Sequence, residues 1–552
     1  MSKVLFNGKV LREPQSATQL RIGIPPQVNP DATNRVLVIG PSTGGLTVAD
    51  NQLYTFNSAS DAAAVLRSGD ALRAIRMIFA PSPSVSGAAQ VDFIRMDVSS
   101  TYATAQFTSP DITFQALDRG VWTNQITIVV TGASTTRQVT VRVPLPQIQG
   151  GTDGAVAGSV FTSATARFKL KGAQIGDSVY LGGSPVNAQV FQIASVDSDT
   201  QVTLVGTPTA ASGQTWAHFV YAPDRVSPLT LASNTDIANW ITDYCSDVLT
   251  TTLVSTVLPT AGTKNLSGGT VALGGTNEIT NALVMARTRD VRHIYVARAC
   301  GGNADELEYS GLLRGHLLNY AEVPAIGYLG AGLDKTRASA ITYAATLNSA
   351  RLVYTFQSIL DRTEDGLSTE KLPGYFLAAK ICGLAAGVTP QTPLTRKAVD
   401  VQGLMPVVAD GPLDRPSREN LLKAGVLHIY QQPGNGAFIV NQGISTTQKQ
   451  DNLFDTTTAT SPEISLTRIC DTLLYNMQIS AQQQFVGTAS SLGQAVIESW
   501  ARNYLESERG NLIIDWRNLS VSRVADRWNV AFAFVPNYPI NYVLVVGTVI
   551  GS

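Results

Sequence analysis

The chain carries little charge for its 552 residues: charged side chains make up 15% of it, against about 25% in a typical globular protein. Its 40 Lys and Arg nearly balance its 41 Asp and Glu, so the net charge is −1. A nucleic-acid binder needs an excess of basic side chains to neutralise phosphates, so the composition argues against nucleic acid as a partner. A nearly neutral surface also does not repel copies of itself, which permits self-association.

Cysteines, histidines and long apolar runs are also few or missing. The four cysteines are scattered along the chain: Cys245, Cys300, Cys382 and Cys470. They form no Cys-x-x-Cys pair, which predicts buried free thiols rather than disulfides or zinc ligands. The four histidines fall in no metal-binding spacing: His218, His293, His316 and His428. No run of about 18 apolar residues exists, so we expect no membrane insertion, and we also expect no cofactor.

The length predicts several domains, because single cores rarely grow beyond about 250–300 residues. The composition and the hydrophobic pattern change along the chain, and these changes predict six parts. They are an extended arm over 1–30, the start of an α/β region over 31–90, a β-rich insert over 91–230, a middle α/β domain over 231–372, a C-terminal core domain over 373–535 and a terminal arm strand over 536–552.

The predicted fold class is a multidomain mixture of α/β and α+β structure. Residues 35–40 form a buried-strand pattern before a glycine-rich turn and a helix. Short β-rich runs between residues 91 and 223 predict a sandwich or a small barrel. Beyond residue 235, helices alternate with strands at 293–297 and 325–328, which indicates a mainly parallel sheet.

Both ends of the chain are apolar and have the pattern of strands. The N-terminal part holds a short apolar patch and an alternating run, and residues 542–549 are β-branched and uncharged. An unpaired strand of this kind invites aggregation, so each must pair within its own fold or with another copy. We therefore predict strand exchange between subunits. The candidate residues are Val4, Leu5, Phe6, Leu20, Ile22, Ile24, Tyr542, Leu544 and Val546.

A helix predicted over residues 491–509 has two distinct faces. Its apolar stripe is predicted to consist of Leu492, Val496, Trp500, Tyr504 and Leu505. Its charged stripe has Glu498, Arg502 and Glu506 at intervals of four residues, with Arg509 close by. The charged stripe is either a solvated face with ordinary intrahelical ion pairs or a surface that docks a partner. The sequence leaves both interpretations open.

One short motif is typical of hydrolases. Residues 40–44 read Gly-Pro-Ser-Thr-Gly, which matches the turn that exposes a nucleophilic serine, here Ser42. Such a turn leads directly into a helix, whereas the next helical pattern begins only near Ser60. We therefore favour a plain turn and keep a hydrolase as an alternative. A static capsid or fibre protein, with a glycan-binding β insert, is another alternative, although no repeat supports a fibre.

Several segments resemble, in order, those of a known family: 35–40 with its turn, 117–126 with Gly-x-Trp-x-Asn, 266–270 with Leu-x-Gly-Gly, 373–383, 421–426, and the pair Thr446 and Thr447. They resemble the tail sheath proteins of contractile phage tails and related injection systems. The resemblance covers most of the chain, apart from much of 151–223.

The resemblance implies a structural protein without catalytic residues, which forms six-fold rings stacked around a tail tube. It implies a sheath core built from both chain ends, whose terminal arms complete a shared sheet with neighbours. The tail tube, baseplate and tail terminator proteins would be its partners, and the tube-facing candidates are Glu498, Arg502, Glu506 and Arg509. Contraction would drive the tube into the host, from a virion tail assembled in the bacterial cytoplasm. The sheath of a phage-derived bacteriocin is a close alternative.

Overall fold

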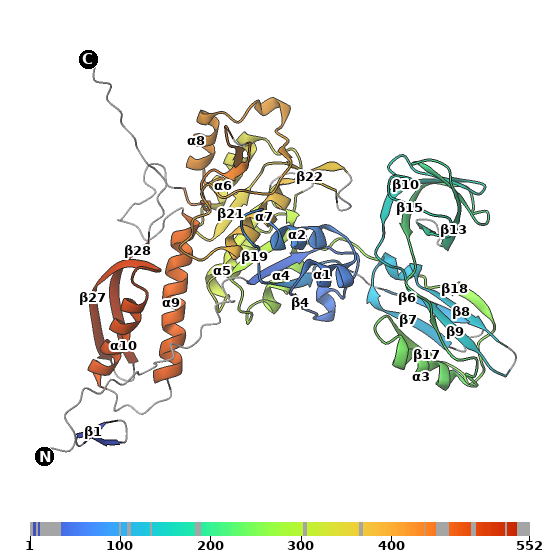
Figure 1. Cartoon of the computed structure of the whole chain (residues 1–552), viewed down its shortest axis with the longest axis horizontal. Coiled ribbons are helices and arrows are strands. Elements are labelled where there is room, and N and C mark those ends of the chain that lie inside the picture. The colour runs from blue at the N-terminus through green and yellow to red at the C-terminus, as the bar shows by residue number, and fades with distance from the viewer. Residues whose placement is uncertain are drawn as a thin grey trace. The chain divides into compact units, whose positions relative to one another are not determined.

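The computed structural model describes residues 4–6, 9–11, 35–98, 101–107, 112–132, 135–182, 189–301, 306–363, 368–434, 436–448, 463–486, 493–524 and 527–537. The chain divides into two compact units (Figure 1). The larger unit contains Thr33–Arg468, and the smaller one joins the N-terminal residues to Ile469–Asn537. We describe each unit by itself.

A six-stranded sheet lies at the centre of the larger unit, in the order β21-β20-β19-β3-β5-β4. Its strands are β3 (Arg35–Gly40), β4 (Tyr54–Phe56), β5 (Gln90–Arg95), β19 (His293–Ala299), β20 (Ile326–Gly330) and β21 (Leu352–Thr355). All neighbours run parallel except β4, which is antiparallel to β5. The mainly parallel sheet inferred from the sequence is therefore confirmed.

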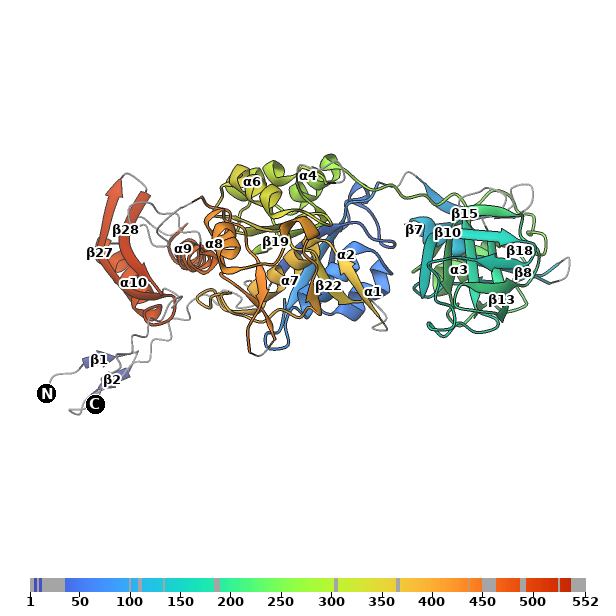
Figure 2. The ribbon, with the colours of Figure 1, turned by 90° about the horizontal axis from the view of Figure 1, so that it is seen from above.

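Helices cover both faces of this sheet, which explains why β3 is apolar at every position from Val36 to Ile39. Figure 2 shows α4 and α6 on one side of β19 and α2 and α7 on the other. Val36 and Val38 pack toward α2 and α7, while Leu37 and Ile39 pack toward α4, α5 and α6. The helices are α1 (Ala59–Leu66), α2 (Asp70–Phe79), α4 (Thr276–Met285), α5 (Ser310–Asn319), α6 (Arg337–Leu347) and α7 (Gly374–Gly387).

The β-rich region contains a closed six-stranded barrel and two smaller sheets. The barrel order is β10-β11-β14-β13-β12-β15, and its core includes Phe161, Phe168 and Trp216. Its strands are β10 (Gln149–Ala157), β11 (Val160–Thr162), β12 (Ser178–Gly182), β13 (Gln189–Val196), β14 (Gln201–Leu204) and β15 (Ala211–Phe219). The barrel is one of the two architectures that the sequence predicted.

The two smaller sheets enclose a core with helix α3 (Asn234–Tyr244), which contributes Ile237 and Trp240. Their strand orders are β16-β9-β8-β18 and β17-β7-β6. The strands are β6 (Tyr102–Phe107), β7 (Ile112–Arg119), β8 (Thr127–Thr131), β9 (Gln138–Arg142), β16 (Arg225–Val226), β17 (Leu249–Leu253) and β18 (Gly262–Asn265). The predicted middle α/β domain included α3, β17 and β18, whereas both strands pair within the β-rich region. The reason is that strand partners distant in sequence leave no local signal. The predicted domain boundaries stay predictions.

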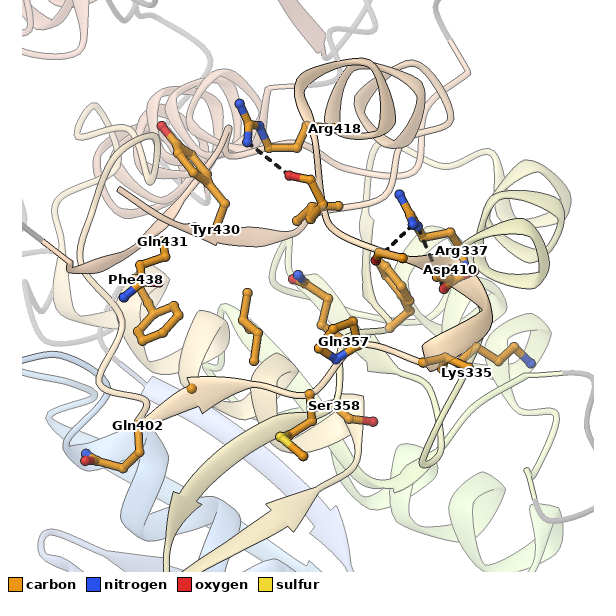
Figure 3. A pocket seen from close by; sticks show the side chains of 18 residues that line it. Lys335, Arg337, Gln357, Ser358, Gln402, Asp410, Arg418, Tyr430, Gln431 and Phe438 are labelled. Carbon is orange, nitrogen blue, oxygen red and sulfur yellow. Dashed lines mark hydrogen bonds and ion pairs between the residues drawn. The ribbon is translucent and has the colours of Figure 1, made fainter. Parts of the chain in front are cut away.

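Short elements follow the central sheet. One small sheet joins β22 (Ile359–Arg362), β23 (Thr369–Leu372) and β24 (Gly403–Leu404), and a hairpin joins β25 (Ile429–Gln431) and β26 (Phe438–Val440). Helix α8 (Arg415–Lys423) lies between them in sequence and ends before Gly425, which adopts a positive φ of 73°. Residues of β24, β25, β26 and α8 line a cavity (Figure 3).

The smaller unit contains the C-terminal helices and a long hairpin. Its elements are α9 (Ile464–Phe485, in the unit from Ile469 onward), α10 (Gln494–Ser507), β27 (Ile513–Val524), β28 (Arg527–Pro536) and the N-terminal strands β1 (Val4–Phe6) and β2 (Lys9–Leu11). The predicted strand at 542–549 lies outside the described residues. Within the described chain, no helix combines the length and the apolar character needed to cross a membrane.

Helix α7 crosses α2 so closely that it tolerates only glycine at one position. A methyl group at Gly383 would lie 2.5 Å from the carbonyl oxygen of Ile78. We predict that Gly383→Ala lowers the free energy of unfolding by about 1–3 kcal/mol, because the helices must move apart. The control is Gly315→Ala in α5, where no heavy atom lies within 4 Å and where Ala should add about 0.5–1 kcal/mol. Urea unfolding of the two variants measures this, and shifts of the same sign would contradict the packing argument.

Candidate assembly surface

Helix α10 lies against its own unit through Ile497, Ala501 and Leu505, which are spaced four residues apart and buried. The predicted apolar stripe was partly wrong: Val496 is half exposed, and Leu492 lies outside the described residues. Ala501 is only weakly hydrophobic, so the large side chains of Val496, Trp500 and Tyr504 dominated the pattern. The predicted stripe was therefore displaced by one residue from the face that is buried.

Trp500 and Tyr504 are half-buried because they reach across to α9. The indole nitrogen of Trp500 donates to Ser480 Oγ at 3.1 Å, and its ring meets Phe485 edge-on, with 5.2 Å between centroids. The hydroxyl of Tyr504 donates to the carbonyl oxygen of Leu473 at 3.2 Å, and burial raises the pKa of Tyr504. These contacts fix α10 on α9 and thereby define which face of α10 is exposed.

The exposed face carries the charged stripe that the sequence predicted. Arg502 and Glu498 form an ion pair of 3.1 Å, and Arg509 lies 3.7 Å from Glu506. The four side chains are 38–53% exposed. Exposed pairs at this spacing contribute only about 0.3–0.5 kcal/mol each to stability. The stripe is therefore unimportant for folding and remains available to a partner.

Strand β27 adds further charged side chains beside this stripe, and the sequence pattern did not predict them. Trp516 donates its indole N–H to Glu506 Oε1 at 3.1 Å, and the Arg502 guanidinium lies over its ring at 5.5 Å. Asp515 lies 3.8 Å from Arg509 and 3.9 Å from Arg517. We call Glu498, Arg502, Glu506, Arg509, Asp515, Trp516 and Arg517 the charged face. Its three acids and three bases balance, so it suits a partner with an alternating pattern of charges rather than one of a single sign.

The β27–β28 hairpin has two long edges without a strand partner in the described part of the chain. The strands contain 12 and 10 residues, and an isolated two-stranded ribbon is only marginally stable in water. Its apolar side chains are incompletely covered: Trp528, Phe532 and Phe534 are half-buried, and Ile514 and Val524 are half exposed. The hairpin therefore offers backbone groups and apolar surface to further strands.

The predicted arm residues are described only in part. Val4, Leu5 and Phe6 form β1, which pairs with β2 in an antiparallel hairpin. The other six lie outside the described residues: Leu20, Ile22, Ile24, Tyr542, Leu544 and Val546. Where the two arms pair therefore stays a prediction.

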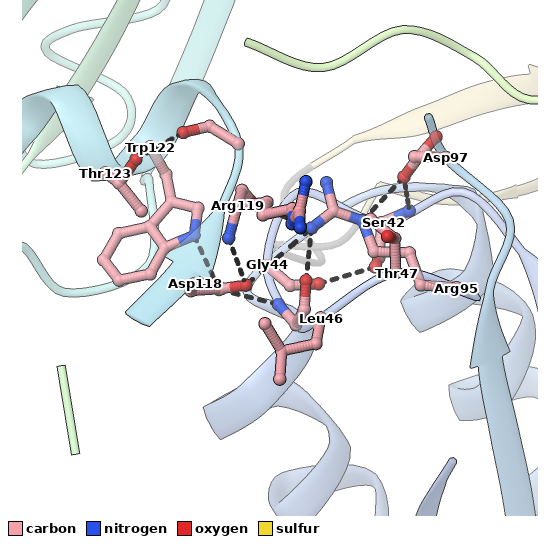
Figure 4. A network of polar contacts seen from close by, with 12 residues as sticks. Ser42, Gly44, Leu46, Thr47, Arg95, Asp97, Asp118, Arg119, Trp122 and Thr123 are labelled. Atoms are coloured by element: carbon pink, nitrogen blue, oxygen red, sulfur yellow. Dashed lines mark hydrogen bonds and ion pairs between the residues drawn. The ribbon is translucent and has the colours of Figure 1, made fainter. Parts of the chain in front are cut away.

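Ser42 is not placed as a nucleophile (Figure 4). Its side chain is buried, and its hydroxyl donates to the carbonyl oxygen of Gly44 at 2.7 Å. The nearby carboxylate of Asp97 accepts the backbone N–H of Ser42 at 2.9 Å instead of its hydroxyl. Because the hydroxyl proton is engaged by a backbone oxygen, Ser42 closes the turn after β3, as the plain-turn interpretation predicted.

The histidines are engaged elsewhere. His218 pairs with Asp177 at 2.9 Å in the barrel, His293 contacts the Tyr328 hydroxyl at 3.1 Å, and His428 lies 2.9 Å from Asn441 Nδ2. Burial lowers the pKa of His428 to about 4 and also lowers the pKa of His316. The described ranges contain no group of three or more His, Cys, Asp or Glu side chains that could hold a metal ion.

A buried arginine joins the turn after β3 to the β-rich region (Figure 4). Arg95 is fully buried and donates to Asp97 at 2.8 Å and to the carbonyl oxygen of Arg119 at 2.7 Å. Asp118, 3.9 Å from Arg95, accepts the backbone N–H of Gly45 and the indole N–H of Trp122. Burial raises the pKa of Asp97 and Asp118, and Arg95 opposes that shift.

Two of the segments that resemble the sheath family contact each other. The side-chain amide of Asn124 donates to the carbonyl oxygen of Gly269 at 2.9 Å and accepts its N–H at 2.8 Å. A methyl group at Gly269 would lie 2.7 Å from the carbonyl oxygen of Gly120. The Gly-x-Trp-x-Asn and Leu-x-Gly-Gly segments thus form one buried joint between residues 145 positions apart. The joint uses the side-chain amide of Asn124 and the absence of a side chain at Gly269.

Known proteins with a similar sequence or a similar fold carry the name of tail sheath proteins. No family model matches the chain. A tail sheath protein of Bacillus phage SP01 is 29% identical over 224 residues, which is 40% of this chain and 37% of the relative. A sheath tail protein from Listeria innocua superposes with a TM-score of 0.58 at 13% identity, over 92% of this chain and 95% of that one. The chain has the fold of the tail sheath proteins.

A second solved structure, a sheath tail protein from Desulfitobacterium hafniense, superposes with a TM-score of 0.54 at 13% identity, over 91% of this chain and 96% of that one. The chain spans about a third of the length of the curated relatives that it matches. The resemblance stated from the sequence and the predicted fold class are both confirmed. The relatives carry the name of a structural tail component rather than of an enzyme.

We predict that Ser42→Ala costs only about 0.5–1.5 kcal/mol, because it removes one hydrogen bond. Arg95→Ala should cost about 3–5 kcal/mol, since it leaves the carboxylates of Asp97 and Asp118 buried without their cation. Chemical unfolding measures both, and p-nitrophenyl acetate turnover tests the serine. An esterase activity that disappears with Ser42→Ala would revive the hydrolase alternative.

Proposed function

We propose that the protein is the sheath subunit of a contractile tail, which polymerises as stacked hexameric rings around a tail tube. The observation that carries the proposal is the unpaired β27–β28 hairpin in a chain with the sheath-protein fold. A hairpin with two open edges, together with two apolar chain ends, is the arrangement expected of subunits joined by exchanged strands.

The arms act as hinges in this proposal. A buried backbone hydrogen bond contributes a net of about 0.5–1.5 kcal/mol, and a buried Val side chain about 1.5–3 kcal/mol. Half a dozen such contacts hold an arm in place while the larger unit rotates as a body. Contraction moves subunits from a metastable extended packing to a more extensive one, and the difference in free energy drives the tube through the host envelope without nucleotide hydrolysis.

The charged face is our candidate for the contact with the tail tube. Ion pairs between half-exposed groups give specificity and registration, yet each separates at low cost. Besides other copies of itself and the tube, the partners in this proposal are the baseplate and tail terminator proteins. The protein would act in the virion tail after assembly in the cytoplasm of the host bacterium. The sheath of a bacteriocin or of another contractile injection system would use the same surfaces.

We predict that deleting residues 542–552 leaves a folded protein that no longer polymerises, because the exchanged strand is lost. Negative-stain electron microscopy of the purified protein measures tube formation, and circular dichroism checks folding. A matched control deletes the two C-terminal residues alone, Gly551 and Ser552, which carry none of the apolar pattern. Sheaths of normal length from the longer deletion would refute the arm model.

We predict that reversing the charged stripe separates the sheath from the tube and leaves sheath polymerisation intact. The variant combines Glu498→Lys, Arg502→Glu and Glu506→Lys, so the pair between positions 498 and 502 is kept with its signs exchanged. The control exchanges Arg415→Glu and Glu419→Arg in α8, another exposed pair four residues apart. Co-sedimentation with purified tube measures binding, and undiminished co-assembly of the stripe variant would exclude α10 as the tube contact.

A further inference from the structure

A cavity of about 520 Å³ lies beyond the carboxyl end of β21. Its wall includes Phe356, Gln357 and Ser358, which directly follow that strand. Figure 3 shows Tyr430, Gln431 and Phe438 on one side of it and Lys335, Arg337 and Asp410 on the other. Crevices outside the carboxyl ends of parallel strands are frequent ligand sites, and a volume of about 300–1,000 Å³ is typical of them.

One side of the cavity is a strand edge that is open at Gln431. In the hairpin β25–β26, Asn441 donates to the carbonyl oxygen of His428 and Gln432 donates to that of Ala437. Because orientation alternates along an antiparallel strand, Ile429 and Gln431 direct their backbone groups away from β26. The side-chain amide of Gln357 already binds Ile429 there, accepting its N–H at 2.7 Å and donating to its carbonyl oxygen at 2.9 Å. Gln357 thus occupies the place of a peptide group of a further strand.

The opposite side is a second open edge. Met405 donates its backbone N–H to the carbonyl oxygen of Ser358 at 3.0 Å, so the preceding residue, Leu404 of β24, directs its backbone groups the other way. Leu404 and Gln431 both line the cavity. Gln357 bonds to β25 and Ser358 bonds to Met405 after β24, so the cavity lies between these two strand edges.

The side chains around the cavity are a mixture of apolar, amide and charged groups, with an excess of positive charge. Lys335, Arg337 and Arg418 line it together with a single carboxylate, Asp410. Lys335 is paired with Glu306 at 2.6 Å and Arg337 with Asp410 at 3.8 Å. Arg418 instead lies over the Tyr430 ring at 4.6 Å and donates to the carbonyl oxygen of Leu413. Its guanidinium forms no ion pair within 4 Å in the described chain, and a carboxylate that acts on it is that of the exposed residue Asp414.

We propose that this cavity binds an extended peptide of another polypeptide, which adds a strand to the open edge of β25. The peptide pairs with the backbone of Gln431, places an apolar side chain against Phe356 and Phe438, and places a carboxylate on Arg418. Backbone pairing supplies affinity, and the alternating side-chain sites supply specificity for an acidic-apolar sequence. The proposal concerns a surface apart from the C-terminal hairpin and does not depend on the sheath function.

The test uses the full chain and a fluorescein-labelled peptide of sequence Thr-Asp-Val-Phe-Asp-Thr, followed by fluorescence anisotropy. We expect saturable binding in the micromolar range. Replacing both Asp by Lys should weaken it about tenfold or more, because the carboxylate on Arg418 is lost. N-methylation at alternate residues of the peptide should abolish binding, since strand pairing needs those N–H groups. Both peptide changes leave the protein untouched, so neither result depends on a variant that folds.

Two protein variants complete the test. Arg418→Glu should weaken binding about tenfold, whereas Arg415→Glu, one turn earlier on α8 and 83% exposed, should leave it unchanged. Thermal unfolding checks that both variants fold. The proposal is overturned if no binding is seen up to millimolar peptide, if the Lys peptide binds equally well, or if the Arg415 variant is equally impaired. A capped Asp-Phe dipeptide that binds as tightly as the whole peptide would replace strand addition with capture of side chains alone.

Discussion

Backbone pairing at strand edges is the constraint on which this structure depends. A buried or apolar strand must satisfy its N–H and C=O groups on both sides. The barrel meets this requirement by closing, since β10 pairs with both β11 and β15. The central sheet meets it in its interior and covers its faces with helices. The β27–β28 hairpin and the strands β24 and β25 do not meet it within the described chain, and both proposals arise from these open edges.

Buried polar joints connect segments of the larger unit that lie far apart in the sequence. Arg95 reaches from β5 to two carboxylates and to backbone oxygens around the turns at Gly45 and Arg119. Asn124 holds Gly269 through two reciprocal hydrogen bonds. Such joints fail as units, because removing one partner leaves the others buried and unsatisfied. The β-rich region is therefore joined to the central sheet by directional bonds rather than by apolar contact alone.

The sequence allowed prediction of what is local. Val36 to Ile39 predicted a buried strand, and the spacing of Glu498, Arg502 and Glu506 predicted one helical stripe. What depends on how elements fold against each other was not predictable: Asp515 and Trp516 join the stripe only because β27 folds back beside α10. The same holds for the barrel, where closure requires residue 149 to pair with residue 218. Local periodicity predicts whether a segment is a helix or a strand, but it does not predict which element lies beside it.

Ion pairs and exchanged strands differ in strength, and this difference explains how the proposed assembly could move without dissociating. A half-exposed ion pair contributes about 0.3–0.5 kcal/mol, so four such pairs between the charged face and a tube would amount to about 1–2 kcal/mol before screening by salt. An exchanged strand with half a dozen hydrogen bonds contributes several kcal/mol at about 0.5–1.5 kcal/mol for each bond, and apolar burial adds to it. In the proposed assembly, the charged contacts to the tube would therefore break before the exchanged strands do. A charge-poor chain with apolar ends is suited to this order of events, because the strongest contacts in the proposed assembly would be those that need no charge.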